Sequence, residues 1–204
     1  MKDIRDVWKQ FRERESTLNG LVCAAGALMD EKVLTDEGIE TTFACHLAGV
    51  YLLTNLARPT LELSEDPRVA LISSGGMYNC RFPSWEKATA SGRGSYNGML
   101  AYSYAKRGQV LLAERMAAIH KDSKVRYTSC HPGWASTPGV DAAFGKKKSW
   151  LEPMRSEWEG AEGIAWLAAV PGEELENGQF YLDRYFFKQH TNKQHCTFKN
   201  TSQT

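Results

Sequence analysis

Ser74, Tyr102 and Lys106 are the residues of this sequence whose types and spacing best suit acid/base chemistry. Tyr102 and Lys106 lie four residues apart, so a helix would place them on one face. An ammonium beside a phenol favours the phenolate, and we therefore expect Lys106 to lower the pKa of Tyr102 from its ordinary value near ~10. Ser74 ends an apolar segment and could hydrogen bond the same substrate oxygen. The three residues predict proton transfer at a carbonyl or alcohol, coupled to a hydride carrier.

A tyrosine and a lysine at this spacing also occur by chance on the flanks of many helices, so the pattern depends on its surroundings. Apolar residues recur at helical spacing in four segments, and four short apolar runs are typical of buried strands. Strands that alternate with helices form a parallel sheet covered on both faces, which predicts an α/β three-layer sandwich. We expect helices at residues 3–15, 35–57, 100–120 and 157–169, and strands at 18–25, 69–74, 126–130 and 179–182.

The composition limits the class of protein. The chain has 204 residues, enough for one domain, and its net charge of +1 gives no long-range attraction to nucleic acid or anionic membranes. No apolar run approaches the ~20 residues of a membrane-spanning helix, and five cysteines without paired spacing indicate free thiols. We expect a cytoplasmic protein with one domain at residues 1–188 and a polar tail at 189–204. Metal binding is not predicted, because His190, His195 and Cys196 match no zinc pattern.

Several segments, in their order along the chain, resemble the short-chain dehydrogenase/reductase superfamily, and within it the group of dehydrogenase/reductase SDR family member 12. They are Asp66-Pro67-Arg68-Val69, Ser73-Ser74-Gly75-Gly76-Met77, the Tyr102/Lys106 pair, and His131-Pro132-Gly133 with the residues up to Val140. The resemblance covers about residues 3–184. It implies an incomplete Rossmann-like sandwich that holds the equivalents of the family's strands 4 to 7.

The resemblance also implies a reaction and a set of site residues. Tyr102 would be the catalytic acid/base, Ser74 would orient the carbonyl or hydroxyl, and Lys106 would bind ribose hydroxyls. The cofactor would be NAD or NADP, and the substrate a small-molecule carbonyl or alcohol. The residues that would contact the cofactor are Gly26, Tyr102, Lys106, Pro132, Gly133 and Thr137.

Three departures from the family pattern stand out. The Asn-Asn-Ala-Gly motif appears as Cys23-Ala24-Ala25-Gly26, and the helix asparagine of many members matches Cys45. The glycine-rich turn that binds the dinucleotide phosphates has no counterpart, because Met1 falls near where the family's third strand would end. We therefore expect a chain without the N-terminal βαβ part and with residues 21–25 on an uncovered sheet edge.

Three alternative interpretations remain. The segment Gly92–Gly98 resembles a dinucleotide fingerprint, but no strand precedes it and Asn97 replaces a glycine, so we predict a loop. Ser74 with His131 could form a hydrolase pair, although no nucleophile elbow surrounds Ser74. The third is a non-catalytic binding protein that forms homo-oligomers through helices 35–57 and 100–120.

The departure at the glycine-rich turn generates a first prediction. We expect the 204-residue chain by itself to bind NAD(H) or NADP(H) weakly or not at all, because no helix N-terminus with a glycine-rich turn is available for the phosphates. Calorimetric titration with each dinucleotide tests this expectation, and micromolar affinity for either one would contradict it.

Overall fold

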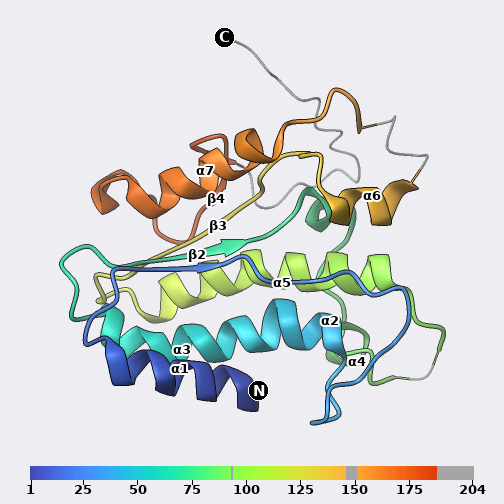
Figure 1. Ribbon diagram of the computed structural model, residues 1–204, viewed down its shortest axis with the longest axis horizontal. Helices are drawn as coiled ribbons and strands as arrows, with labels where there is room; N and C mark the ends of the chain where they lie inside the picture. The colour runs from blue at the N-terminus through green and yellow to red at the C-terminus, as the bar shows by residue number, and fades with distance from the viewer. Residues whose placement is uncertain (93, 146–150, 188–204) are drawn as a thin grey trace.

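The structure is a computed structural model that describes residues 1–187 except 93 and 146–150, and it centres on a five-stranded sheet (Figure 1). The strands lie in the order β1-β2-β3-β4-β5. The first four are parallel, and β5 is antiparallel to β4. Their bounds are β1 Gly20–Cys23, β2 Arg68–Ile72, β3 Arg126–Cys130, β4 Phe180–Leu182 and β5 Tyr185–Phe187.

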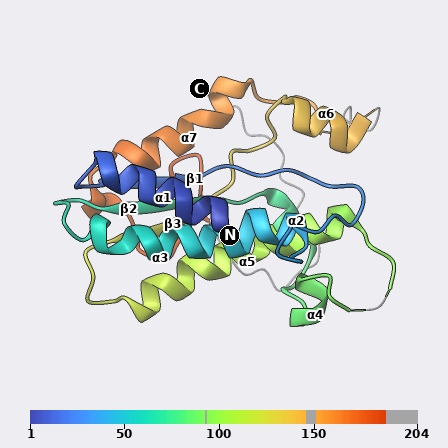
Figure 2. The ribbon, with the colours of Figure 1, turned by 60° about the horizontal axis from the view of Figure 1, so that its bottom comes forward.

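Helices cover both faces of this sheet (Figures 1 and 2). Helix α7 packs on one face, α3 and α5 pack on the other, and α1 lies alongside α3. The α-helices are α1 Lys2–Arg14, α2 Thr41–Phe43, α3 Gly49–Leu61, α4 Trp85–Ala88, α5 Gly98–Ile119, α6 Pro138–Phe144 and α7 Glu157–Ala169. A π-helical turn, η1 (Ala44–Ala48), joins α2 to α3, and short 3-10 helices lie at η2 Gly75–Asn79 and η4 Gly172–Glu174.

The core lies on the two faces of β2, where all five residues are buried. Val69 and Leu71 face the layer of α3 and α5, whereas Ala70 and Ile72 face α7. Successive side chains of a strand point to opposite faces, so a central strand covered on both sides is mostly apolar, as Val69–Ile72 are here. This packing explains why β2 reads as a mostly apolar run in the sequence.

The α/β sandwich with a mostly parallel sheet is confirmed, and the bounds of β3 and α7 agree with the predicted ranges. The predicted helix 35–57 is wrong at both ends. Residues 35–40 form a turn in which Gly38 has a φ of +75°. The helix begins only after Glu40, whose carboxylate accepts hydrogen bonds from the backbone N–H groups of Thr42 and Phe43. Sequence analysis also missed β5, which follows a tight turn at Asp183 and Arg184, both with positive φ.

Strand β1 is an outer strand in the part of the chain that the structure describes, with β2 as its neighbour in the sheet. The side chain of Val22 is 39% exposed, and Ala24, Ala25 and Gly26 after it are also exposed. This agrees with the expected uncovered edge. Within the described ranges, no helix has the length and apolar character needed to cross a membrane. The predicted tail at 189–204, with His190, His195 and Cys196, lies outside the described residues.

The packing of β4 generates a second prediction. Phe180 is fully buried and packs with Met77 and Val110, whereas Phe186 on the neighbouring strand is 63% exposed. We expect Phe180→Ala to lower the free energy of unfolding by about 3–5 kcal/mol, because it leaves a cavity. The matched Phe186→Ala change should stay within about 0.5 kcal/mol. Urea unfolding followed by circular dichroism measures both; equal losses would show that the core does not extend under β4.

Candidate active site

The predicted site residues follow three adjacent parallel strands. Gly26 comes after β1, Ser74 comes after β2, and Pro132 and Gly133 come after β3. The strand register aligns Cys23 with Leu71 and Ile72 with Cys130, so all three strands end at the same edge of the sheet. The carboxyl ends of parallel strands form the ligand crevice of open α/β sheets. The structure therefore brings the segments after β1, β2 and β3 to one edge.

Ser74 and Tyr102 meet at this edge. The Ser74 side chain lies close enough to the Tyr102 phenol to lower its pKa. The Ser74 Oγ also accepts a hydrogen bond from the backbone N–H of Gly76 at 3.3 Å, which fixes the serine at the start of η2. Tyr102 lies in the first turns of α5, whose N-terminus is capped by the Asn97 side chain at 2.9 Å from the Leu100 nitrogen. Local hydrogen bonds thus fix the Ser74 hydroxyl and the start of the helix that carries Tyr102.

Two buried hydrogen bonds join the next turn of α5 to the end of β2. The Lys106 Nζ donates to the Ile72 carbonyl at 2.6 Å, and the Ser73 Oγ donates to the Lys106 carbonyl at 2.7 Å. The Lys106 ammonium lies 5.4 Å from the centroid of the Tyr102 ring. Burial lowers the pKa of Lys106 to about 8, because the charged form loses hydration. A buried cation therefore lies next to the phenol, as the helical spacing predicts.

The expected direction of the Tyr102 pKa shift is wrong for the protein in this structure. Burial raises the pKa of the Tyr102 phenol above its ordinary value, and the hydrogen bond with Ser74 lowers it by less. Loss of water disfavours the phenolate. The Lys106 ammonium lies over the ring face and bonds to a carbonyl, so it does not compensate for that loss at the hydroxyl.

The remaining predicted residues lie on either side of this pair. Gly133 has a φ of +80°, and a Cβ there would lie 2.6 Å from the guanidinium of Arg155. That guanidinium donates to the Pro132 carbonyl at 3.2 Å and pairs with Asp183. Thr137 caps α6, where its hydroxyl accepts from the Val140 nitrogen at 3.3 Å. Pro132 and Gly133 are therefore held rigidly, and Thr137 has a structural contact of its own.

Sequence analysis missed His46. Its ring packs edge-on against the ring of Tyr102, with 5.2 Å between centroids and an interplanar angle of 88°. Cys45, which the sequence comparison aligned with the family's helix asparagine, is instead exposed. The sequence does contain a feature that could have pointed to His46: it is an ionisable residue within an otherwise apolar helical segment, Phe43–Leu53.

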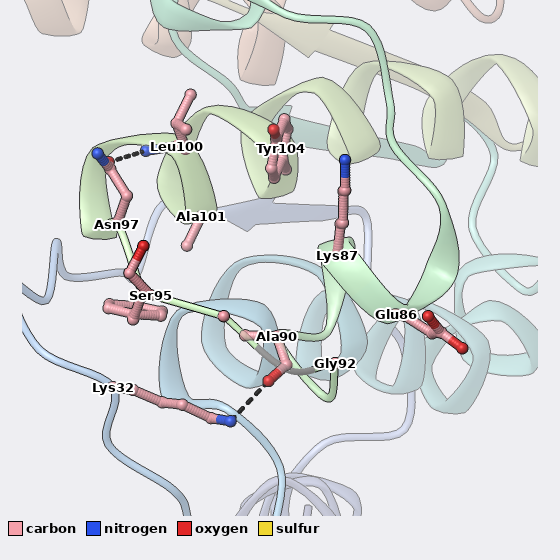
Figure 3. Close-up of a pocket in the computed structure, with 12 residues that line it drawn as sticks. Lys32, Glu86, Lys87, Ala90, Gly92, Ser95, Asn97, Leu100, Ala101 and Tyr104 are labelled. Carbon is pink, nitrogen blue, oxygen red and sulfur yellow. Dashed lines mark hydrogen bonds between the residues drawn. The ribbon is translucent and has the colours of Figure 1, made fainter.

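A cavity of about 300 Å³ lies beside the first turns of α5 (Figure 3). Tyr104 lines it, and two residues correspond to about 200° around a helix, so Tyr102 and Tyr104 point in opposite directions. Lys32 and Lys87 approach this cavity from different segments, and the Lys32 Nζ donates to the Ala90 carbonyl at 2.6 Å. The described residues of 92–97 form a loop in its wall, in agreement with the predicted loop. This cavity is separate from the Ser74 and Tyr102 hydroxyls.

Comparison with known proteins is informative at the level of the family. No family model matches the chain. Dehydrogenase/reductase SDR family member 12 of Bos taurus is 37% identical over 184 residues, which cover 88% of this chain and 57% of that protein. The protein of the same name from Homo sapiens is 36% identical over 188 residues, which cover 90% of this chain and 58% of that protein. Over about nine tenths of its length the chain is therefore similar to proteins of the short-chain dehydrogenase/reductase superfamily. The resemblance indicated by its motifs is confirmed.

A solved short-chain dehydrogenase shows the same fold. The crystal structure of the enzyme from Burkholderia cenocepacia in complex with NADP superposes with a TM-score of 0.66 at 18% identity, and the match covers 87% of this chain and 68% of that one. At this identity the likeness establishes the fold alone. The chain spans less than three fifths of the length of the two family-member-12 relatives named above.

Two buried histidines at this edge generate a third prediction. The pKa of His46 and of His131 is lowered to about 4, mainly by burial and to a smaller extent by nearby cations, Lys106 and Arg155 respectively. The ordinary value in an unfolded chain is about 6.5. Between these values the unfolded chain binds more protons than the folded chain, so the free energy of unfolding decreases as the pH falls.

We expect a loss of about 2 kcal/mol per histidine between about pH 7 and about pH 5, measured by urea unfolding at a series of pH values. Replacing the imidazole in His46→Phe should remove the His46 share of this dependence. A variant with the full dependence of the wild type would refute the assignment of His46 as a buried neutral residue.

Proposed function

We propose that this chain carries the proton-transfer site of an NAD(P)-dependent oxidoreductase that interconverts a small-molecule carbonyl and alcohol. The observation that carries the proposal is the contact of the Ser74 and Tyr102 hydroxyls at the carboxyl edge of a parallel sheet, with the Lys106 ammonium 5.4 Å from the tyrosine ring. The similarity to the superfamily and the motif order support the same chemistry.

Each of the three residues has a separate task in this reaction. Tyr102 donates its phenolic proton to the carbonyl oxygen during reduction and accepts a proton from the hydroxyl during oxidation. Ser74, fixed by the Gly76 N–H, provides a hydrogen bond to the same oxygen. Lys106 holds its ammonium 5.4 Å from the centroid of the Tyr102 ring, where its remaining N–H groups can bind hydroxyl groups of the bound ligand. The raised pKa of Tyr102 keeps the phenol protonated and ready to donate.

The residues at this edge fit a nicotinamide dinucleotide in part. Gly26 is exposed and has no side chain to block a ligand at the end of β1. The Lys106 Nζ uses one of its three N–H donors on Ile72, so it retains donors for hydroxyl groups. The bound dinucleotide would supply or accept the hydride. Thr137 would reach it only from the first turn of α6, which the threonine caps.

The fourth prediction uses two tyrosines of the same helix. We expect Tyr102→Phe to lower kcat/KM for carbonyl reduction by about 10²–10⁴-fold, because it removes the proton donor. Tyr104→Phe removes the same hydroxyl from the opposite side of α5 and should leave kcat/KM unchanged. Reduction of a panel of aldehydes and ketones with NADH and NADPH, each at the highest usable concentration, provides the rates. Similar losses in both variants would remove Tyr102 from the proposed role.

The experiment also separates the alternatives. Ester hydrolysis that disappears in Ser74→Ala but persists in Tyr102→Phe would favour a hydrolase. If the wild-type chain shows no turnover even at the highest usable dinucleotide concentration, a non-catalytic binding or oligomerisation protein is favoured. That second candidate is supported by exposed apolar residues on the helices predicted to form a homo-oligomer, namely Tyr51 on α3 and Leu100 and Ile119 on α5. Analytical ultracentrifugation determines the oligomeric state.

A further inference from the structure

His46 lies in the one wide turn of the α2–η1–α3 helix. The Gly49 nitrogen donates to the Ala44 carbonyl five residues earlier, which is the hydrogen bond of a π-helix. Such single-turn bulges change the direction in which nearby side chains point and are frequent at functional sites. Here Cys45 is exposed, and His46 is only 2% exposed. The wide turn therefore accompanies an inward-pointing imidazole.

The imidazole of His46 fills the space between the end of β1 and α5, the helix that carries Tyr102. It packs edge-on against Tyr102, as described above. On its other side, a Cβ added to Gly26 would lie 1.9 Å from the His46 Cε1 and 2.4 Å from its Nδ1. Only a glycine fits there while the ring is in place. The position of the segment after β1 and the position of the Tyr102 ring thus depend on the same side chain.

The hydrogen bonds of His46 determine its protonation state. Its Nε2 lies 2.8 Å from the Ala27 carbonyl, which can only accept, so Nε2 carries the proton. Nδ1 is then an unprotonated acceptor, and it is buried without a hydrogen-bond partner in the described part of the protein. A buried polar atom left unpaired costs about 1–3 kcal/mol. Purely apolar packing at this position would avoid that cost, which points to a role for the imidazole itself.

The charged groups around His46 act on it from two helices. Lys106 on α5 disfavours a second positive charge and lowers the pKa of His46, whereas the Glu40 carboxylate before α2 has the opposite, smaller effect. Glu40 is occupied by the N–H groups of Thr42 and Phe43 and by the Tyr96 hydroxyl at 3.0 Å. The ring also contacts Tyr102 and the Ala27 carbonyl.

We propose that His46 is a positioning residue of the redox site: its neutral imidazole holds the Tyr102 phenol against Ser74, and protonation of the ring releases that phenol. The proposal deepens, and for its catalytic consequence rests on, the oxidoreductase function proposed above. Protonation places a new N–H at Nδ1, where no acceptor lies, and a second cation near Lys106. Both changes destabilise the protonated His46 ring in its buried position against Tyr102. The tyrosine then loses the contact that fixes its orientation.

The fifth prediction follows the Tyr102 ring directly in the full chain. The protein is labelled with ¹³C at the tyrosine Cζ, and the Tyr102 signal is identified by its absence in Tyr102→Phe. At neutral pH, His46→Phe should keep the Tyr102 signal near its wild-type position, because a ring still fills the space. His46→Ala should shift it, whereas the matched Cys45→Ala change on the exposed side of the same helix should leave it unchanged. On acidification, the wild-type signal should move with the same midpoint as the His46 Cε1–H signal, and His46→Phe should lack this step.

Two further measurements exclude a merely structural role or a misfolded variant. Gly26→Ala should destabilise the wild-type chain but be tolerated in the His46→Ala background, because the added methyl then occupies vacated space. Where turnover is detected, His46→Ala should lower kcat by about 10²-fold with little change in KM, as expected for a displaced catalytic group, and His46→Phe should restore it at neutral pH.

An unchanged Tyr102 signal in His46→Ala, or an acid step that persists in His46→Phe, would overturn the proposal. The comparison of variants at neutral pH decides it even if acid unfolds the chain. Absence of turnover in every variant would count against the oxidoreductase function alone, since the spectroscopic results do not depend on activity.

Discussion

The site depends on one buried contact, the hydrogen bond from the Lys106 ammonium to the Ile72 carbonyl. A charged group that is almost fully buried is tolerated only when it is hydrogen bonded, so this contact fixes α5 relative to the end of β2. The Ser73 hydroxyl reinforces the same junction through the Lys106 carbonyl. With the junction fixed, Tyr102, one turn earlier on α5, must lie beside Ser74, the second residue after β2. The geometry of the candidate site is therefore a consequence of how one helix is attached to one strand.

The parallel sheet extends this junction into a site. Since β1, β2 and β3 run in the same direction, the segments after them converge at one edge, with Gly26, Ser74 and Gly133 next to one another in sheet order. Helix α5 separates this edge from the cavity lined by Tyr104. This cavity and the residues that could move a proton thus lie on different sides of one helix. Chemistry here is indicated by the polar groups at the strand ends.

Burial acts on the two titratable groups of the site in opposite directions. It lowers the pKa of Lys106 and raises the pKa of Tyr102, because in both cases the charged form loses water. The phenol is therefore protonated in this structure, and the ammonium is easier to deprotonate than a lysine in water. His46 completes this environment as an uncharged neighbour that contacts the tyrosine without adding a charge.

The sequence by itself determined the alternation of strands and helices, the bounds of β3 and α7, and the shared face of Tyr102 and Lys106. These follow from local periodicity, because the spacing of apolar residues and the 3.6-residue turn are properties of short segments. The order of the motifs was enough to indicate the family. The antiparallel β5 was missed because a three-residue strand leaves too short a pattern, and the start of the long helix was missed because the Glu40 cap and the Gly38 turn override its apolar spacing.

Only the tertiary structure decided that His46 rather than Cys45 faces Tyr102, and that the pKa of the tyrosine rises. A single π turn rotates the side chains of a helix by a fraction of a turn, and no periodic pattern shows where it occurs. The sign of the pKa shift depends on how much water the fold removes from the phenol and on whether the ammonium lies over the ring or beside the hydroxyl. Both are properties of several segments packed together, which is why spacing along one helix could not reveal them.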